Sequence, residues 1–255
     1  MSLFPWATSS LLPGEVALVG AGPGDPELLT VKALNLISQA DVVVYDRLVS
    51  AAIMALLPEA TETIYAGKYA DNHILTQEQI NNELVTQAQS DKRVVRLKGG
   101  DPFIFGRGGE ELEVLIENNI QCHIVPGITA ASGCATYAAM PLTHRNLSLG
   151  CTMVTGHSKS GESDLPWQHL AGLGHTLVFY MGLKALPNIS ENLQKYGLSA
   201  DTPAAVIEKG TTPEQKVVVS TLAGLPQQVT QHNIKPPTLV VVGEITALSE
   251  QLSQL

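Results

Sequence analysis

Short apolar runs alternate with amphipathic segments along the first half of the chain. Each apolar run predicts a buried strand, and the segments between the runs predict helices. The predicted strands are residues 16–20, 41–45, 62–66, 93–97 and 121–125. The predicted helices are residues 28–38, 50–56, 76–89, 108–118 and 129–139, the third with Thr76 as N-cap and Gln79 completing a capping box. Continuous apolar strands that alternate with helices are typical of a mainly parallel sheet covered on both faces.

The pattern starts again after Met140-Pro141. The predicted strands of this half are residues 151–155, 176–180, 204–208, 216–220 and 238–242, with helices near 185–195 and 221–231. Residues 209–213 are too few to form a crossover helix between the third and fourth of these strands, so an antiparallel hairpin is expected there. The second half is therefore predicted to be a mixed α/β domain.

The helix-breaking residues Pro141, Asn146 and Gly150 place the expected domain boundary near 141–150. We expect an N-terminal α/β domain over residues 14–143 and a C-terminal mixed α/β domain over residues 144–255. Residues 1–13 have neither a basic n-region nor a full hydrophobic region, so a flexible tail is expected rather than a signal peptide.

Composition narrows the functional classes. Hydrophobic residues make up 44% of the chain and charged residues 15%, which is ordinary for a globular protein. No apolar run approaches the roughly 18 residues of a membrane span, and a net charge of −9 argues against a nucleic-acid partner. The three cysteines and seven histidines show no metal-ligand or disulfide spacing, so no metal site is expected and a reducing cytoplasm fits.

The arginines are all in the first part of the chain. They are Arg47, Arg93, Arg96, Arg107 and Arg145. Because arginine binds carboxylates and phosphates through two parallel hydrogen bonds, this distribution favours a local anion site. For each arginine, pairing with a nearby Asp or Glu is an equally good interpretation.

The stretch from Val94 to Glu111 contains the densest set of chemical groups. An apolar strand leads into a glycine-rich turn and then into a helix with an acidic start. Glycines let a backbone approach a ligand closely, and the Lys and Arg side chains supply cations. The pattern predicts a ligand site at the carboxyl end of this strand.

A second glycine-rich loop, from Gly20 to Pro26, follows the first strand. A dinucleotide-binding fingerprint would continue directly into a helix. Pro23 and Pro26 interrupt that continuation. An NAD(P)-dependent oxidoreductase is therefore a weak alternative, which cofactor titration would test.

Two charged residues follow the next strands. Asp46 comes at the end of one strand, and Lys68 follows Gly67 at the end of the next. Strand ends are the usual place for chemistry in open α/β sheets. Residues in these positions are also often turn residues or helix caps.

Five strings together resemble the tetrapyrrole methylases, the class III methyltransferases that use S-adenosylmethionine (SAM). The strings occur in the order expected for that family and are residues 20–26, 97–111, 125–133, 140–145 and 155–157. The resemblance extends from Gly14 to about Leu248. Within the family, the string from Arg96 to Glu111 is similar to the uroporphyrinogen-III branch.

The resemblance implies two α/β domains with SAM bound in the cleft between them and S-adenosylhomocysteine as product. The implied cofactor contacts are Pro23, Gly99, Gly100, Asp101, Ile104, Thr129, Ala130, Met181 and Gly210. Asp101 can accept hydrogen bonds from ribose hydroxyls or the methionine ammonium. Ile104 and Met181 can enclose the adenine, although core packing is an equal alternative for Met181.

The implied reaction is methylation of uroporphyrinogen III at C-2 and C-7, which gives precorrin-2 for siroheme or cobalamin synthesis. The resemblance assigns Asp46 as proton acceptor and Lys68 as proton donor. The many carboxylates of the substrate suit Arg47, Arg107 and Arg145, and a homodimer is expected.

One local difference and two alternatives stay open. Related sequences often have Gly-Lys-Arg where this chain has Gly67-Lys68-Tyr69, so the substrate contacts there are not defined. A methylase of a later corrin precursor or of diphthine is one alternative. A non-catalytic tetrapyrrole-binding module is the other.

Overall fold

The computed structural model describes residues 8–67, 75–156 and 165–252. The chain divides into two compact units, and the point of division in the sequence is between Thr129 and Ala130. This division lies earlier in the sequence than the domain boundary that was expected near residues 141–150. The helix that starts at Ala130 belongs to the second unit because its residues Ala131, Cys134 and Ala135 pack into a core with strand residues of that unit.

Unit 1, up to Thr129, contains a five-stranded sheet in the order β3-β2-β4-β1-β5. The strands are β1 (Val16–Gly20), β2 (Val42–Tyr45), β3 (Glu62–Tyr65), β4 (Val94–Lys98) and β5 (Cys122–Val125). The helical segments are η1 (Pro26–Leu28), α1 (Val31–Ile37), α2 (Ala51–Met54), α3 (Gln77–Gln89) and α4 (Gly108–Glu117). Every strand pair is parallel, as the sequence predicted.

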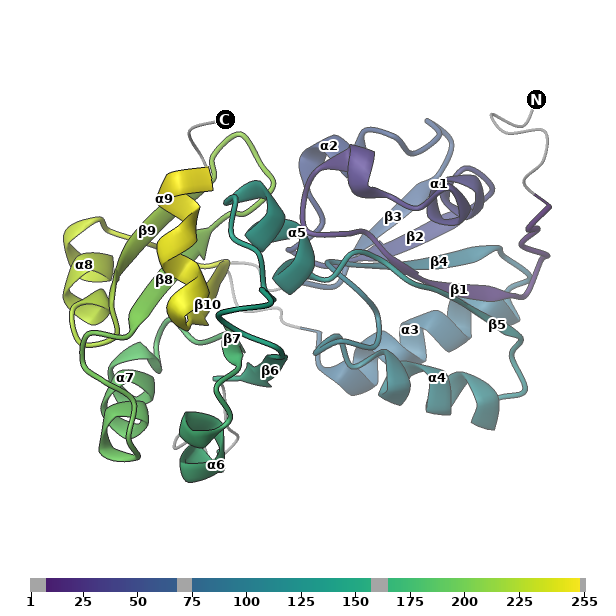
Figure 1. The fold of residues 1–255 in the computed structure, drawn as a ribbon. Helices are drawn as coiled ribbons and strands as arrows, with labels where there is room; N and C mark the ends of the chain where they lie inside the picture. The colour runs from purple at the N-terminus through teal and green to yellow at the C-terminus, as the bar shows by residue number, and fades with distance from the viewer. Residues whose placement is uncertain (1–7, 68–74, 157–164, 253–255) are drawn as a thin grey trace. The chain divides into compact units, whose positions relative to one another are not determined.

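Helices cover both faces of this sheet, with α1 and α2 on one face and α3 and α4 on the other (Figure 1). Alternate residues of β4 point to opposite faces of the sheet. Val95 and Leu97 lie in the core under α1 and α2, and Val94 lies in the core under α3 and α4. The predicted capping box is present, with the Thr76 hydroxyl accepting from the Gln79 N–H and the Gln79 side chain accepting from the Thr76 N–H.

Unit 2, from Ala130, contains a mixed five-stranded sheet in the order β6-β7-β10-β8-β9. The strands are β6 (Cys151–Thr155), β7 (Thr176–Tyr180), β8 (Pro203–Glu208), β9 (Lys216–Thr221) and β10 (Thr238–Val242). The helical segments are α5 (Ala130–Tyr137), α6 (Trp167–Gly172), α7 (Leu186–Lys195), α8 (Leu225–Gln231), η2 (Glu244–Leu248) and α9 (Ser249–Leu252). The expected hairpin of β8 and β9 is confirmed, whereas the sequence pattern missed α6, η2 and α9.

Residues 8–13, which are part of the tail that was expected to be flexible, contact the rest of unit 1. From Thr8 onward the segment is described, and Leu11 is buried in the core beneath α1. The Leu11 N–H donates to Gln39 Oε1 at 3.1 Å, and the Asn35 side chain donates to the Ser9 carbonyl at 2.7 Å. Gln39 Nε2 also donates to the Ser9 carbonyl at 3.2 Å. One buried leucine and these hydrogen bonds therefore hold residues 9–11 on unit 1.

The sequence predicts neither a membrane span nor a disulfide. Within the described ranges, no helix has the length and apolar character needed to cross a membrane. The three cysteines all lie in these ranges and are free thiols. Burial raises the pKa of Cys122 and of Cys134 to about 11.

An ion pair joins the amino ends of β2 and β4. Arg93 Nε donates to Asp41 Oδ2 at 2.9 Å, and the Arg93 backbone N–H donates to the same oxygen at 2.8 Å. The hydrogen bonds from Arg93 outweigh burial and hold the pKa of Asp41 at about 2, below its ordinary value of 3.8. A carboxyl group with a lowered pKa stabilises the fold above its ordinary pKa, and this contribution is lost as the pH falls through the folded value.

We therefore predict that Asp41→Asn lowers the free energy of unfolding at pH 7 by about 1 kcal/mol or less, because solvent screens a pair that is more than a third exposed. The difference from wild type should shrink as the pH falls from about 4 to about 2. Urea unfolding at pH 7 and near pH 2 measures it. An equal deficit at both pH values would show that the Asp41 charge is not the cause.

Candidate active site

Three loops follow the carboxyl ends of neighbouring strands in unit 1. In the sheet register Gly20 of β1 lies beside Lys98 of β4, and Tyr45 of β2 lies beside Leu97. Because the strands are parallel, residues 21–25, 46–50 and 99–107 emerge from one edge of the sheet. Ligands of open α/β sheets bind at this edge. Most of the unit 1 residues that the sequence singled out are therefore brought together here.

The glycine-rich loops are joined by their backbones. Gly22 and Gly100 form a bridge, in which the Gly22 N–H donates to Gly100 O at 3.1 Å and the Gly100 N–H donates to Gly22 O at 2.7 Å. A Cβ on Gly127 would lie 2.2 Å from the Gly100 oxygen, and a Cβ on Gly99 would lie 2.4 Å from Leu48 Cβ. Gly127 is thus required by backbone packing and Gly99 by its contact with Leu48. These contacts and the Gly22–Gly100 bridge hold the loops after β1, β2, β4 and β5 together at one edge.

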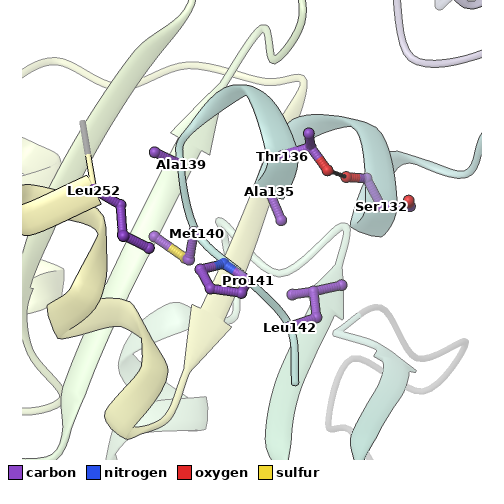
Figure 2. Close-up of a pocket in the computed structure, with 8 residues that line it drawn as sticks. All are labelled: Ser132, Ala135, Thr136, Ala139, Met140, Pro141, Leu142 and Leu252. Atoms are coloured by element: carbon purple, nitrogen blue, oxygen red, sulfur yellow. Dashed lines mark hydrogen bonds between the residues drawn. The ribbon is translucent and has the colours of Figure 1, made fainter. Parts of the chain in front are cut away.

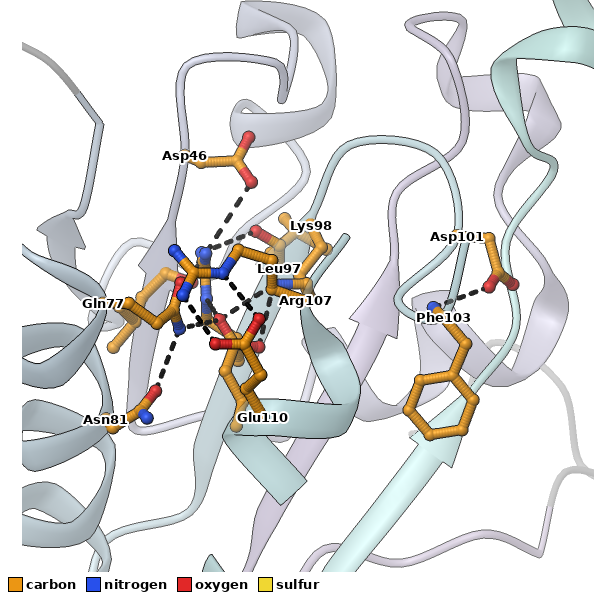
Figure 3. Close-up of polar contacts among 12 residues, drawn as sticks. Asp46, Gln77, Asn81, Leu97, Lys98, Asp101, Phe103, Arg107 and Glu110 are labelled. Carbon is orange, nitrogen blue, oxygen red and sulfur yellow. Dashed lines mark hydrogen bonds and ion pairs between the residues drawn. The ribbon is translucent and has the colours of Figure 1, made fainter. Parts of the chain in front are cut away.

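Asp101 connects two of these loops. Its Oδ1 accepts from the Phe103 N–H at 2.8 Å (Figure 3). Its Oδ2 accepts from the Gly127 N–H at 3.0 Å. The sequence predicted a carboxylate directed at a ligand. In the structure this carboxylate holds the loops together, and each oxygen keeps capacity for a further hydrogen bond.

The loop between β4 and α4 presents apolar side chains to solvent. Phe103 is 52% exposed, Ile104 38% and Phe105 41%. Arg107 is also exposed and forms two hydrogen bonds with the Glu110 carboxylate, from Nε and Nη2. The expected role of Arg107 in anion binding therefore involves competition with its own neighbour on α4.

Asp46 and Arg47 begin the loop after β2. Asp46 Oδ1 accepts from the Leu48 N–H at 2.9 Å, and Asp46 Oδ2 lies 3.8 Å from Arg96 Nη2. The Asp46 side chain is 24% exposed, so solvent or a ligand can reach it. Arg47 is exposed. Both residues thus lie at the edge where the sequence placed them.

Behind this edge is a buried charge cluster that the sequence analysis missed. Arg96 Nε donates to Glu111 Oε1 at 3.1 Å, and Lys98 Nζ donates to both Glu111 oxygens at 2.8 Å. Gln77, from α3, also donates to Glu111 at 3.3 Å (Figure 3). Arg96 and Lys98 are 3% exposed and Glu111 is fully buried.

We call Arg96, Lys98 and Glu111 the buried charge cluster. Burial, followed by the Arg96 charge, lowers the pKa of Lys98 from its ordinary value, although Glu111 opposes the shift. A signal for the cluster was present in the sequence. Arg96 lies within the predicted strand 93–97 and Lys98 directly follows it. Cations buried in a sheet that is covered on both faces require a counter-charge.

Unit 2 has a corresponding edge of its own. Strands β7 and β8 are both antiparallel to β10, and β6 is parallel to β7, so β6, β7 and β8 end on the same side. Met181 follows β7 directly, and Gly210 follows β8 after Lys209. Met181 has a left-handed backbone (φ 54°) and is 54% exposed, so core packing is the wrong interpretation of that residue.

The other site residues predicted in unit 2 have mixed environments. Gly210 is buried against α5, since a Cβ there would lie 2.4 Å from Cys134 Sγ. Tyr180 accepts, through its hydroxyl oxygen, from the Ala131 N–H at 2.8 Å, which fixes the start of α5 beside Ala130. Arg145 is exposed. Lys68, Tyr69 and His157 lie outside the described residues.

Unit 2 also contains an open pocket of about 370 Å³, formed by α5, the segment that follows it and Leu252 (Figure 2). Its lining is mostly apolar, and the Thr136 hydroxyl is turned inward to the Ser132 carbonyl at 2.8 Å. None of the predicted site residues lines it. The pocket therefore has no charged group to position a reaction.

Comparison with known proteins identifies the class. The family of tetrapyrrole (corrin/porphyrin) methylases matches residues 15–226. The match covers most of the chain, so the protein belongs to this family.

Two curated relatives are siroheme synthases. That of Pseudomonas fluorescens (strain SBW25) is 59% identical and that of Ruthia magnifica subsp. Calyptogena magnifica 56% identical, each over 94% of this chain. The alignments cover 52% and 51% of the relatives, so the chain spans about half the length of the curated relatives that it matches.

Two solved structures are also similar. The uroporphyrin-III C-methyl transferase of Thermus thermophilus, complexed with S-adenyl homocysteine, aligns with a TM-score of 0.78 and 38% identity over 92% of this chain and 99% of that one. A cobalamin biosynthetic enzyme, cobalt precorrin-4 methyltransferase, aligns with a TM-score of 0.82 and 27% identity over 91% of this chain and 96% of that one.

The backbone packing gives a prediction for Gly127. In Gly127→Ala the new methyl group would collide with the Gly100 carbonyl and force the loops apart, so the free energy of unfolding should fall by about 1–3 kcal/mol. Gly109→Ala is the matched control, because a Cβ there meets nothing within 4 Å. That control should leave stability unchanged or raise it by up to about 1 kcal/mol. Urea unfolding of both variants measures the difference, and equal stabilities would contradict the loop packing.

Proposed function

We propose that the chain transfers two methyl groups from SAM to C-2 and C-7 of uroporphyrinogen III and thereby forms precorrin-2. The observation that carries this proposal is the joined set of loops at the carboxyl edge of unit 1, with Asp46 partly exposed beside them. The siroheme synthases and the Thermus thermophilus methyltransferase support the choice of substrate. The resulting precorrin-2 would serve siroheme or cobalamin synthesis.

The residues of unit 1 fit a SAM molecule. The Gly99–Gly100 backbone has no side chains to keep a ligand away, and Asp101 keeps hydrogen-bonding capacity for ribose hydroxyls or an ammonium. Ile104 is exposed at the same loop, and Pro23 and Thr129 are partly exposed. In unit 2 the exposed Met181 offers a thioether and methylene surface to an aromatic ring. Ala130 and Gly210 complete the proposed set.

In this reaction SAM supplies an activated methyl group that a pyrrole carbon can attack without a covalent enzyme intermediate. The protein has to align the two reactants and exclude water. Methylation leaves positive charge on the macrocycle, and a proton is then lost from it. Asp46 stabilises that charge and accepts the proton. Lys68, to which the family resemblance assigns the role of proton donor, keeps that role in this proposal.

The arginines are the proposed substrate contacts. Arg47 and Arg145 are exposed and can each bind a carboxylate through two hydrogen bonds. Arg107 can bind a substrate carboxylate only if its guanidinium releases the Glu110 carboxylate or binds both carboxylates at once. A homodimer and a cytoplasmic location remain part of the proposal.

The direct test incubates the protein with SAM and uroporphyrinogen III under reducing conditions and follows the product by mass spectrometry. We expect a mass gain of two CH2 units, because each added methyl group is accompanied by the loss of one proton. Two molecules of S-adenosylhomocysteine should form for each molecule of product. A parallel reaction with a precorrin-4 substrate tests the alternative that the cobalt precorrin-4 methyltransferase structure suggests. Binding of uroporphyrinogen III without any mass gain would indicate a non-catalytic module.

Asp46→Asn should lower kcat by about 10²–10⁴-fold, because the amide cannot accept the proton. The KM values for SAM and for uroporphyrinogen III should change little, since Asp46 acts in the transition state. Asp41→Asn makes the same change at the amino end of the same strand and should keep full activity. Steady-state kinetics with each substrate varied in turn would detect this, and an unaltered kcat in Asp46→Asn would remove the assigned role.

A further inference from the structure

The side chain of Arg96 has two carboxylates within reach and forms a hydrogen bond with only one. Its Nε donates to Glu111 Oε1 at 3.1 Å, and its Nη1 donates to the Val44 and Leu97 carbonyls at 3.3 Å. The Nη2 atom is 3.8 Å from Asp46 Oδ2, which exceeds hydrogen-bonding distance. An unrestrained arginine and carboxylate would approach to about 2.7–2.9 Å.

Glu111 is firmly fixed. It lies on α4, is fully buried, and accepts hydrogen bonds from Lys98 on both oxygens. Gln77 supports it further from α3. The carboxylate that restrains Arg96 therefore cannot follow Arg96 toward Asp46.

The two oxygens of Asp46 have different neighbours, and Oδ2 is the one that faces Arg96. Asp46 Oδ1 already accepts from the Leu48 N–H at 2.9 Å. A closer Arg96 would donate to Oδ2 and offset the negative charge that makes the carboxylate a proton acceptor. The distance of 3.8 Å leaves Oδ2 able to accept a proton while the nearby positive charge still orients it.

We infer that Glu111 is a positioning residue that keeps Arg96 from closing onto Asp46, and so keeps one Asp46 oxygen available as the proton acceptor. The inference rests on the proposed function of Asp46. It assigns Glu111 no contact with substrate or cofactor.

The first variant is Glu111→Gln. Without the Glu111 charge, Arg96 should move to Asp46, and kcat should fall by about tenfold to a hundredfold, less than the full contribution of a general base. The KM values for SAM and uroporphyrinogen III should stay within about threefold of wild type, because no binding group changes. Glu113→Gln, an exposed position on the same helix, is the matched control and should behave as wild type.

Glu111→Gln also leaves two buried cations without their carboxylate, so a loss of stability could by itself lower activity. The double variant Lys98→Met/Glu111→Gln removes one charge of each sign and should regain most of the stability. Arg96 is still released in this protein, so kcat should stay low. Recovery of kcat together with stability would show that Glu111 is only structural.

Crystal structures of the wild type and the double variant provide a readout that does not depend on activity. The Arg96 Nη2–Asp46 Oδ2 separation should shorten from 3.8 Å to hydrogen-bond length in the double variant. An unchanged separation would overturn the inference. If the wild type does not methylate uroporphyrinogen III, the proposed function fails, and the measured separation still decides whether Glu111 restrains Arg96.

Discussion

The contact of Glu111 with Arg96 and Lys98 is the interaction on which the site in unit 1 depends. Both cations lie on the central strand β4, where solvent cannot screen them, and a fully buried carboxylate from α4 balances them. Removing one partner of a buried ion pair typically costs about 3–5 kcal/mol. The sheet can hold positive charge near Asp46 because α4, which packs on the same face as α3, brings the Glu111 carboxylate to both cations. Helix packing and the electrostatics of the reaction are thus linked through one side chain.

The second constraint is the close approach of backbones at the same edge. The Gly22–Gly100 bridge and the contact of Gly127 with Gly100 leave no room for a Cβ at position 127. Asp101 adds hydrogen bonds to the backbone of two loops. A loop fixed in this way loses little entropy when a ligand binds, which favours precise placement of a methyl donor. The glycines are therefore needed for the packing of the loops, and the same lack of side chains leaves the backbone accessible to a ligand.

Unit 2 obtains a comparable edge from a different topology. Its sheet is mixed, but β6, β7 and β8 run in the same direction because β10 separates β7 from β8 and is antiparallel to both. The residues after β7 and β8 consequently emerge on one side, where Met181 is exposed and Gly210 packs on Cys134. The order of strands, and not their parallel pairing, brings these two positions to one edge.

The sequence by itself determined the strands of both sheets, the β8–β9 hairpin, the capping box at Thr76 and the location of Asp46 and Asp101 at strand ends. These features depend on local periodicity, turn length and the fixed direction of parallel strands, all of which are encoded within short segments. Only the tertiary structure decided that α5 belongs to unit 2, that Leu11 anchors the start of the chain, and that Met181 is exposed. It also decided that Arg96 and Lys98 are paired with Glu111. Burial and charge pairing depend on which surfaces meet across the fold, and a segment's own pattern does not contain its partner.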